Sequence, residues 1–402
     1  MIVFHRKRSD FHMEAMAYFR EIVTTDRRIQ ELKESPRMVV GVFCNFVPEE
    51  IIYGLSAIPV RLCSGDFELA RLGEEVFPRD VCSLAKASVG MAVGNHPLFE
   101  RLDFVIIPTP CDAKKKLCNV FRSYKQVHVL QLPPCKHETE AQRFWVEQVW
   151  KLKEKLEELT GKKLAKNGLK EAILMLNRRR EAFMRFLEIR KLTPPVISGK
   201  EALMVTMASF YDDPERWTEM VLRLCEELEE KRSNGQFICD IFAPRVLITG
   251  APLVYPNFKL IDIIESAKAV VAIDDLCSGT QRLYQPTIVK EWSMKEMIRA
   301  IAERTLLPSM CPCFVENEDR INRVNQLVEE FQVDGVIHHN LRICPLFDIE
   351  SASIHSELKR RNVPCLVLST DYTYEDTQQI RNRVEAFLEM ILGRIAASKG
   401  RH

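Results

Sequence analysis

Short apolar runs alternate with helical segments in two stretches of this chain, and this alternation constrains its fold more than any other feature. Each run has the length of a buried strand, about four to eight residues, and is too short for a buried helix. The runs are Met38–Cys44, Ile58–Cys63, Phe104–Pro108 and Val127–Leu132 in the first stretch, and Arg245–Gly250, Ala269–Asp274, Gly335–His339 and Pro364–Ser369 in the second. Strands separated by helices predict an α/β protein with a doubly wound parallel sheet in each stretch.

The stretch between the two sets of strands predicts helices instead. Apolar residues recur there at helical spacing over Phe144–Leu156, Leu169–Leu192 and Trp217–Glu230. The run Arg178–Arg180 in this stretch is typical of a solvated helix face. Outside it, residues 11–36 predict a polar helix.

These patterns divide the chain into parts. The last predicted helix covers Thr377–Ile395. The predicted division is an N-terminal helical segment over 1–37, a first α/β domain over 38–136, a helical insert or cap over 137–240, and a second α/β domain over 241–402.

Composition and charge place the chain among ordinary globular proteins. Its 402 residues are ample for two domains, and 46% hydrophobic with 28% charged residues excludes a disordered or collagen-like chain. The 57 Lys and Arg nearly balance the 56 Asp and Glu, so no overall charge attracts nucleic acid or an anionic membrane. We find no secretory signal and no apolar run of about 18 residues. We therefore expect a cytoplasmic protein with neither nucleic acid nor membrane as a partner.

Cysteine is unusually frequent, with 13 cysteines against only 15 glycines. An odd number of thiols in a reducing compartment disfavours a disulfide framework. Five of the cysteines follow predicted strands: Cys44, Cys63, Cys111, Cys277 and Cys344. Ligands of open parallel sheets bind outside the carboxyl ends of the strands. If the two sheets face each other, these thiols meet in one cleft.

The two halves of the chain repeat the cysteine pattern. No CxxC pair, the usual element of a structural zinc site, occurs. Thiols that are scattered along the chain and joined only by the fold are more typical of an iron–sulfur cluster held between domains, and buried structural cysteines are the alternative. The matching orders are Cys63, Cys82, Cys111 in the first half and Cys277, Cys313, Cys344 in the second.

Two of these cysteines begin predicted helices, where the helix dipole stabilises a thiolate. Cys82 precedes Ser-Leu-Ala-Lys, and Cys111 precedes Asp-Ala-Lys-Lys-Lys. Lysines in a first turn oppose the dipole, so Lys114–Lys116 either balance an anionic cluster, meet an acidic partner protein, or form a solvated face. The other cysteines are predicted to be structural: Cys118, Cys135, Cys225, Cys239 and Cys365.

Several motifs, in this order, resemble the 2-hydroxyacyl-CoA dehydratase / benzoyl-CoA reductase family over residues 38–395. The resemblance implies two flavodoxin-like domains with an iron–sulfur cluster between them, and Cys82, Cys111 and Cys344 match the three cluster-ligand positions. It also implies a separate ATP-hydrolysing activator protein, with its own [4Fe-4S] cluster, as the electron donor. The motifs are Gly41-Val-Phe-Cys-Asn-Phe-Val-Pro-Glu-Glu-Ile-Ile-Tyr-Gly54, Ile58-Pro-Val-Arg-Leu-Cys63, Thr109-Pro-Cys-Asp112, Asp274-Asp-Leu-Cys-Ser-Gly279, Val333-Asp-Gly-Val-Ile337 and the Cys344 region.

Additional thiols resemble one branch of that family, the double-cubane cluster proteins. Cys63 in Arg-Leu-Cys-Ser-Gly and the pair Cys311-Pro-Cys313 carry this resemblance. It implies an [8Fe-9S] cluster with six cysteine ligands, in a homodimeric, ATP-dependent reductase of small unsaturated molecules that works under anaerobic conditions. The expected ligands are Cys63, Cys82, Cys111, Cys313 and Cys344, with Cys44 and Cys277 competing for the sixth place and Cys311 as a further alternative.

Other residues carry weaker signals. Glu49 and Glu50 open a helix after Pro48, and Glu49 is a candidate proton donor near the cluster. His338 and His339 end a strand, where core histidines with satisfied hydrogen bonds are the alternative to a role at the cluster. No Walker A, GxGxxG or GxSxG motif occurs, so ATP is expected to bind the activator and not this chain.

Two other functions stay open from the sequence. One is an (R)-2-hydroxyacyl-CoA dehydratase subunit, a lyase that holds a single [4Fe-4S] cluster and works with a homologous second subunit. The other is a non-enzymatic protein whose cysteines are structural or bind zinc. Iron and sulfide analysis separates the three functions.

Overall fold

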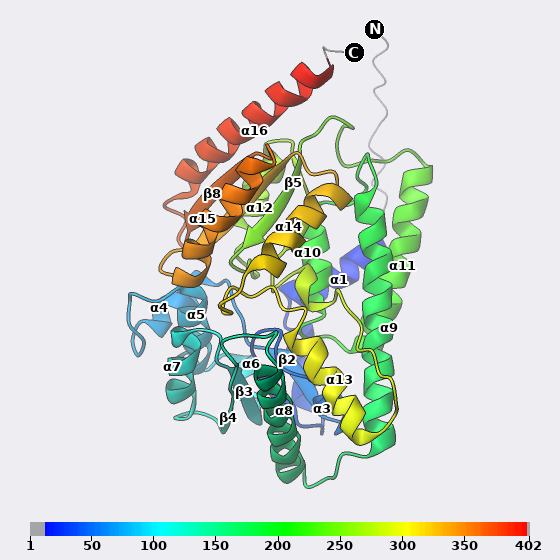
Figure 1. The fold of residues 1–402 in the computed structure, drawn as a ribbon, viewed down its shortest axis with the longest axis vertical. Coiled ribbons are helices and arrows are strands. Elements are labelled where there is room, and N and C mark those ends of the chain that lie inside the picture. Colours follow the sequence, from blue (N-terminus) through cyan, green and yellow to red (C-terminus); the bar gives the residue numbers. More distant parts are fainter. Residues whose placement is uncertain (1–12, 400–402) are drawn as a thin grey trace.

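Two four-stranded parallel sheets form the framework of the protein, in a computed structural model that describes residues 13–399 (Figure 1). The strand orders are β2-β1-β3-β4 in the first sheet and β6-β5-β7-β8 in the second, so both sheets are wound in the same way. This order is that of flavodoxin-like sheets. The predicted fold class, two doubly wound parallel sheets with a helical stretch between them, is confirmed.

Each of the eight apolar runs predicted as a strand forms one. The central strands of both sheets are buried along their whole length, which explains why they appear as continuous apolar runs. The strands are β1 (Val39–Val42), β2 (Ile58–Arg61), β3 (Phe104–Pro108), β4 (Val127–Leu130), β5 (Arg245–Gly250), β6 (Val270–Asp275), β7 (Gly335–Leu341) and β8 (Cys365–Thr370).

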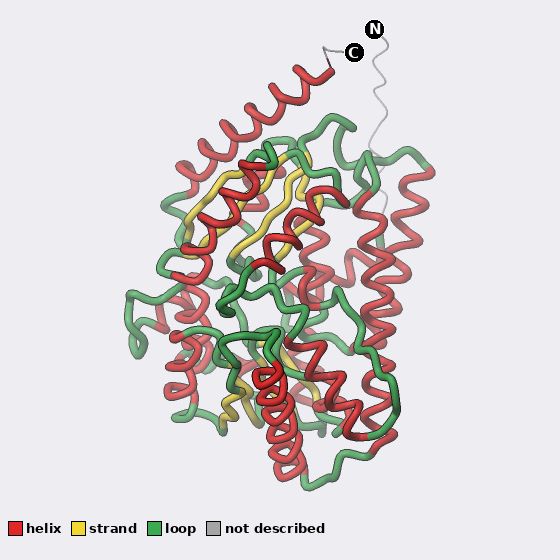
Figure 2. The backbone as a smooth tube through the Cα atoms, in the orientation of Figure 1, coloured by secondary structure: helices red, strands yellow, loops and turns green. Residues whose placement is uncertain are grey.

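Helices connect the strands and cover both sheets. In Figure 2 the strands form two separate groups with helices around each. Around the first sheet lie α2 (Arg27–Glu34), α3 (Glu49–Gly54), α4 (Phe67–Gly73), α5 (Ser83–Val93), α6 (Pro97–Glu100) and α7 (Asp112–Phe121). The second half adds α12 (Lys259–Ser266), the 3₁₀ turn η1 (Thr280–Arg282), α13 (Met294–Leu306), α14 (Glu318–Glu330), α15 (Pro345–Arg360) and α16 (Thr377–Lys399).

The N-terminal segment differs from the single polar helix predicted over residues 11–36. Among the described residues it forms two helices, α1 (Glu14–Thr24) and α2, because Thr25 takes an extended conformation between them. Residues 11 and 12 lie outside the described residues. Phe19 of α1 packs into the core of the second half, whereas Leu32 of α2 packs into the first.

The middle helices α8 (Thr139–Thr160), α9 (Lys166–Lys191), α10 (Gly199–Ala208) and α11 (Pro214–Ser233) contribute to the cores of both sheets. Trp145 and Leu169 pack into the first core, and Phe183, Leu203 and Trp217 into the second. The long helix α9 runs beside both halves (Figure 1). The predicted boundaries at 37, 136 and 240 stay a prediction.

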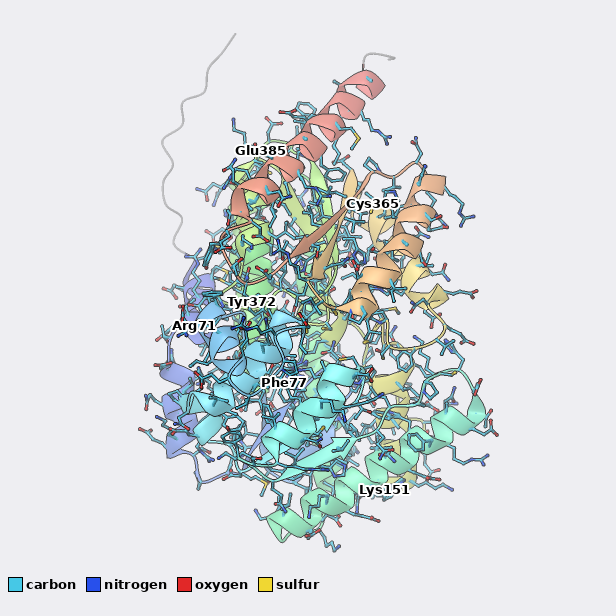
Figure 3. The ribbon with its side chains drawn as sticks, turned by 90° about the vertical axis from the view of Figure 1, so that its left-hand side faces the viewer. Arg71, Phe77, Lys151, Cys365, Tyr372 and Glu385 are labelled. Carbon is cyan, nitrogen blue, oxygen red and sulfur yellow. The ribbon has the colours of Figure 1, made fainter. Side chains whose placement is uncertain are left out.

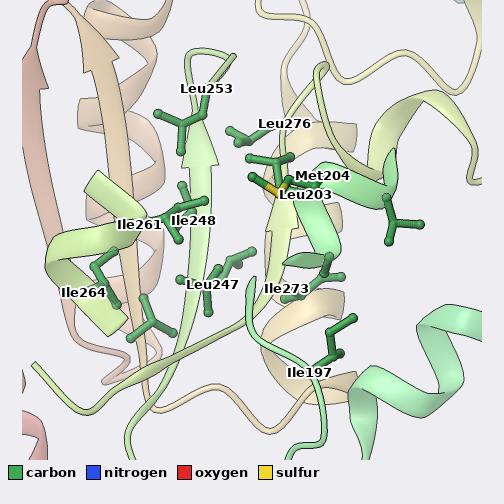
Figure 4. Close-up of a cluster of buried hydrophobic side chains, with 14 of the residues drawn as sticks. Ile197, Leu203, Met204, Leu247, Ile248, Leu253, Ile261, Ile264, Ile273 and Leu276 are labelled. Carbon is green, nitrogen blue, oxygen red and sulfur yellow. The ribbon is translucent and has the colours of Figure 1, made fainter. Parts of the chain in front are cut away.

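The second core shows how the sheet and the middle helices pack together (Figure 4). Leu247 and Ile273 of neighbouring strands, Leu203 of α10 and Ile261 of α12 all belong to one buried hydrophobic cluster. In the other half, α13 leaves the second sheet and packs on α8, where the indole Nε1 of Trp145 donates to the carbonyl of Ala302 over 3.1 Å. No helix among the described residues has the length and apolar character needed to cross a bilayer.

Candidate functional site

The cysteines that the sequence put forward as ligands converge where the carboxyl ends of the two sheets meet. Each lies near enough to at least one other of these thiols to interact with it electrostatically. Tyr372, labelled at the junction of the halves in Figure 3, interacts in the same way with two of them. The converging thiols, called the thiol cluster below, are Cys44, Cys63, Cys82, Cys111, Cys277, Cys311, Cys313 and Cys344.

Three members of the thiol cluster are N-cap residues. Cys82 precedes α5, Cys111 precedes α7 and Cys344 precedes α15. In each case backbone N–H groups of the first helical turn lie near the sulfur and lower the pKa of the thiol, which favours the thiolate. The predicted position of Cys82 and Cys111 at helix starts is confirmed.

Cys82 and Cys344 bring the two halves into direct contact at the cluster. Interaction with the Cys344 thiol lowers the pKa of Cys82 to about 6, and the same interaction raises the pKa of Cys344 well above its ordinary value. Only one of two adjacent sulfurs readily takes a negative charge without a cation between them. The sulfurs of Cys82 and Cys344 are therefore suited to bind a common cation between them.

Two thiols that do not cap helices, those of Cys44 and Cys277, are affected mainly by burial. Burial raises the pKa of Cys277 to about 12 and that of Cys44 further. Cys44 takes a left-handed backbone conformation, with φ 59°, at the end of β1. The pairing registers of the two sheets place Gly250, with φ 108°, at the position in β5 that corresponds to Cys44 after β1. The two sheets thus end in the same kind of turn, and only the first has a thiol there.

Lys114 is a buried cation beside the thiol cluster. Its side chain is 7% exposed, and its ammonium lies 3.9 Å from the centre of the Phe43 ring with no hydrogen-bond partner among the described residues. The charge lowers the pKa of several thiols, Cys44 and Cys82 among them. Of the three alternatives for Lys114–Lys116, a solvated face is therefore wrong for Lys114, whereas Lys115 and Lys116 are exposed.

The loops that carry the thiols are fixed by contacts between distant parts of the chain. The N–H of Gly65 donates to the carbonyl of Tyr255 over 2.9 Å, and a Cβ on Gly65 would clash with the backbone of Val254. Only glycine allows this close approach beside Cys63. In the second half, Arg320 donates to the carbonyl of Met310 over 2.9 Å and so holds the loop of Cys311 and Cys313.

A buried group of ion pairs lies next to the thiol cluster. Arg179 bonds to Glu49 over 2.8 Å and Arg180 to Glu50 over 2.7 Å, and all four side chains are buried. The prediction of a solvated face for Arg178–Arg180 is thus wrong for two of the three residues. Their partners lie 130 residues away in the sequence, which local spacing does not report.

Glu49, the candidate proton donor, is held ionised. Burial alone would raise the pKa of Glu49, but the guanidinium groups of Arg282 and Arg179 outweigh it and keep that pKa well below its ordinary value. A carboxylate in this state anchors arginines better than it donates a proton. Its catalytic role stays a prediction.

The sequence analysis missed Arg61, which is 3% exposed and donates to Oδ1 of Asn45 over 2.8 Å. Its signal was a single charged residue in an apolar strand run, two positions before Cys63. A charge in a buried strand requires a partner and so marks a polar site.

The two strand-end histidines differ in their surroundings. The Nδ1 of His339 donates to the Ala251 carbonyl and its Nε2 accepts from the Thr370 hydroxyl, both over 2.9 Å, which assigns the tautomer. His339 is thus a satisfied core histidine. His338 is fully buried, and neither ring nitrogen has a hydrogen-bond partner among the described residues.

Cysteines outside the thiol cluster are structural in position. Cys225 is fully buried in α11 and Cys118 nearly so in α7. Cys365 begins β8, well away from the junction in Figure 3. Cys135 and Cys239 lie in loops and take no part in the thiol cluster.

The spacing of the thiols bears on the kind of metal centre. Over residues 13–399, no group of three or more His, Cys, Asp or Glu side chains is close enough to hold a single metal ion. A zinc ion holds its sulfurs at about 2.3 Å and therefore in mutual contact. A cluster of several iron atoms spaces its thiolates more widely.

Known proteins match this chain over most of its length. The family model of the 2-hydroxyglutaryl-CoA dehydratase D-component matches residues 44–391. YjiM of Escherichia coli, whose name describes it as a dehydratase subunit, is 32% identical over 90% of this chain and 94% of its own length. The (R)-2-hydroxyglutaryl-CoA dehydratase beta subunit of Acidaminococcus fermentans is 22% identical, over 90% of this chain and 95% of its own.

A reductase is also represented among the relatives. One subunit of the benzoyl-CoA reductase of Thauera aromatica is 20% identical over 95% of this chain and 98% of its own length. These relatives are all named as enzyme subunits, and the family match runs from residue 44 to residue 391. The chain belongs to the 2-hydroxyglutaryl-CoA dehydratase D-component family.

Proposed function

We propose that this protein is an iron–sulfur reductase that holds an [8Fe-9S] double-cubane cluster at the junction of its two sheets. The observation that carries the proposal is the convergence of eight thiols from both halves, more than the three that the single-cluster alternative would use. The substrate would be a small unsaturated molecule. Electrons would come from a separate ATP-hydrolysing activator, and the protein would be a homodimer.

The matching topology of the sheets supports an assignment of six ligands. Cys63 and Cys277 follow equivalent edge strands of the two sheets, and Cys111 and Cys344 cap the helices after equivalent strands. Cys82 and Cys313 lie between these positions. Cys44 has no counterpart, because Gly250 stands in its place. We therefore favour Cys277 over Cys44 as the sixth ligand.

The residues around the thiols suit an anionic cluster. Thiolates and sulfides give such a cluster a net negative charge, which the unpaired ammonium of Lys114 and the helix N-termini behind Cys82, Cys111 and Cys344 would stabilise. When bound, the cluster would supply low-potential electrons. The protein residues would hold it, exclude water and balance its charge.

A second candidate is a dehydratase subunit with a single [4Fe-4S] cluster. The names of YjiM and of the Acidaminococcus protein favour it. In that case Cys82, Cys111 and Cys344 would be the ligands, and Cys63, Cys277 and Cys313 would be free thiols.

Iron and sulfide analysis of protein purified under anaerobic conditions tests the proposal. The double cubane predicts about eight iron atoms and nine sulfides per chain, and the dehydratase subunit about four of each. Protein that stays free of iron and colourless after reconstitution with iron and sulfide would contradict both. Reduction that proceeds without ATP and an activator would contradict the proposed electron donor.

A further inference from the structure

A cavity of about 290 Å³ opens beside the thiol cluster, between η1, α13 and α14. Asn45, which directly follows Cys44, forms part of its wall, and so does Met310, which directly precedes Cys311. One side of the cavity therefore borders both halves of the thiol cluster. At about 30 Å³ for a water-sized group, the cavity has room for about ten such groups.

Two arginines of this wall have no carboxylate partner among the described residues. Arg304 uses its guanidinium to donate to the carbonyls of Arg282, over 2.7 Å, and Gln285, over 3.3 Å. Arg323 is 8% exposed and lies 3.6 Å from the centre of the Tyr284 ring. Burial, together with repulsion from the nearby Arg180, lowers the pKa of Arg304 to about 9. An anion in the cavity would relieve this repulsion.

The inner wall adds to the positive charge. A small enclosed space lies behind the cavity and shares Asn45, Arg282 and Arg304 with it. Its other cationic residues are Arg61, Arg179 and Arg180. Five guanidinium groups face two carboxylates there, those of Glu49 and Glu50, so three positive charges are in excess. Buried nitrogens of Arg61, Arg179 and Arg180 have no hydrogen-bond partner among the described residues. Buried cations in excess are costly unless an anion joins them.

We propose that this cavity binds the carboxylate of a small organic acid, held by Arg304 and Arg323, with the rest of the molecule beside the thiol cluster. The inference rests on the proposed function, and it names the class of its substrate. A guanidinium fork matches a planar carboxylate. A phosphate is disfavoured because the lining lacks the glycine-rich loop that cradles phosphate in many phosphate sites.

Calorimetric titration of the anaerobically purified protein with succinate tests the proposal. We expect succinate to bind, and Arg304→Gln and Arg323→Gln each to weaken that binding by about 10- to 100-fold. Arg304→Lys, which keeps the charge but loses the fork, should weaken it less. The matched control is Arg143→Gln on the exposed face of α8, which should bind as the wild type does. Circular dichroism confirms that each variant is folded.

Inorganic phosphate is the second titrant. Phosphate that binds as tightly as succinate would overturn the carboxylate assignment, and so would an absence of succinate binding or wild-type affinity in both glutamine variants. Iron is measured in the same samples. Protein without iron that still binds succinate would contradict only the proposed function, whereas iron-loaded protein that does not bind it would contradict only this inference.

Discussion

The two sheets carry their thiols on the same kind of edge, yet the protein supports the two edges in different ways. At the first edge Lys114 is buried and has no hydrogen-bond partner among the described residues. At the second edge Arg320 donates to Glu350, to Asp275 over 3.2 Å, to Thr249 over 2.9 Å and to the loop before Cys311.

The difference separates two uses of a buried charge. The second edge satisfies its arginine from within the protein, so that edge is a preformed support for its loop. The first edge leaves its lysine unpaired, which costs free energy in the protein alone and becomes favourable when an anion arrives. The second edge thus holds an arginine whose charge is paired within the protein. The first edge holds a lysine whose charge an anion bound there would compensate.

Substitution of the thiols at equivalent positions of the two sheets should have the largest effect, a loss of iron. Cys63→Ser and Cys277→Ser should each lower the iron content from about eight toward about four per chain, because each would remove a ligand at an equivalent place. Cys44→Ser, at the position without a counterpart, should keep the iron. Colorimetric iron analysis with circular dichroism measures both iron and fold.

Cys225→Ser is the control for these exchanges, since that thiol lies in the core of α11. It should keep all the iron and change the unfolding free energy by about 1 kcal/mol. Full iron in Cys63→Ser, or loss of iron in folded Cys225→Ser, would show that strand-end position does not identify ligands in this protein.

Loss of Arg320, which supports the loop before Cys311, should have the next largest effect, a fall in the unfolding free energy. Arg320→Met leaves the buried carboxylates of Asp275 and Glu350 uncompensated, and we expect it to lower the unfolding free energy by about 3–5 kcal/mol. Urea unfolding measures the change. Arg361→Met, at a side chain that is itself exposed, should cost less than about 1 kcal/mol, and equal costs for the two variants would contradict the role of Arg320.

The second edge also predicts a dependence on pH. Burial lowers the pKa of His339 to about 4, so folding favours the neutral ring. The resulting stability is complete above the unfolded pKa of about 6.5 and is lost as the pH falls toward 4, by about 3 kcal/mol in all. His339→Gln keeps a donor and an acceptor at this place and should flatten that part of the profile. Unfolding free energies measured from pH 7 to pH 4 compare the two proteins, and identical slopes would contradict the assignment.

Lys114→Met should give the smallest change in stability, with the opposite sign to Arg320→Met. Without the cluster, removal of an unpaired buried charge should raise the unfolding free energy by about 1–2 kcal/mol. With the cluster bound, loss of the same charge should lower the reduction potential by tens of millivolts, because the cation favours the more negative, reduced state. Urea unfolding and a redox titration measure the two effects. If Lys114→Met lowered the unfolding free energy of the cluster-free protein, the proposed difference between the two edges would be wrong.

Local pattern in the sequence determined the framework of this protein. A strand buried on both faces needs a continuous apolar run, and each predicted run became a strand within one or two residues of the expected ends. Parallel pairing then places the strand ends of each sheet on one edge, so the sequence predicts that Cys63 and Cys111 share one edge and Cys277 and Cys344 the other. That the two edges face each other was only a condition of the prediction, and the tertiary structure decided it. Cys82 was predictable from its place before a helix.

Only the tertiary structure decided which charges are buried and what they contact. A run such as Arg178–Arg180 has the same local pattern whether its partner is water or a carboxylate 130 residues away. The same holds for Lys114, which shares its helix turn with two exposed lysines, and for α13, which leaves its own sheet to pack on α8. Helical spacing in the sequence predicts which residues share a face of a helix, but only the fold determines what that face packs against. Here the packing of distant elements forms the arginine-lined cavity beside the thiols.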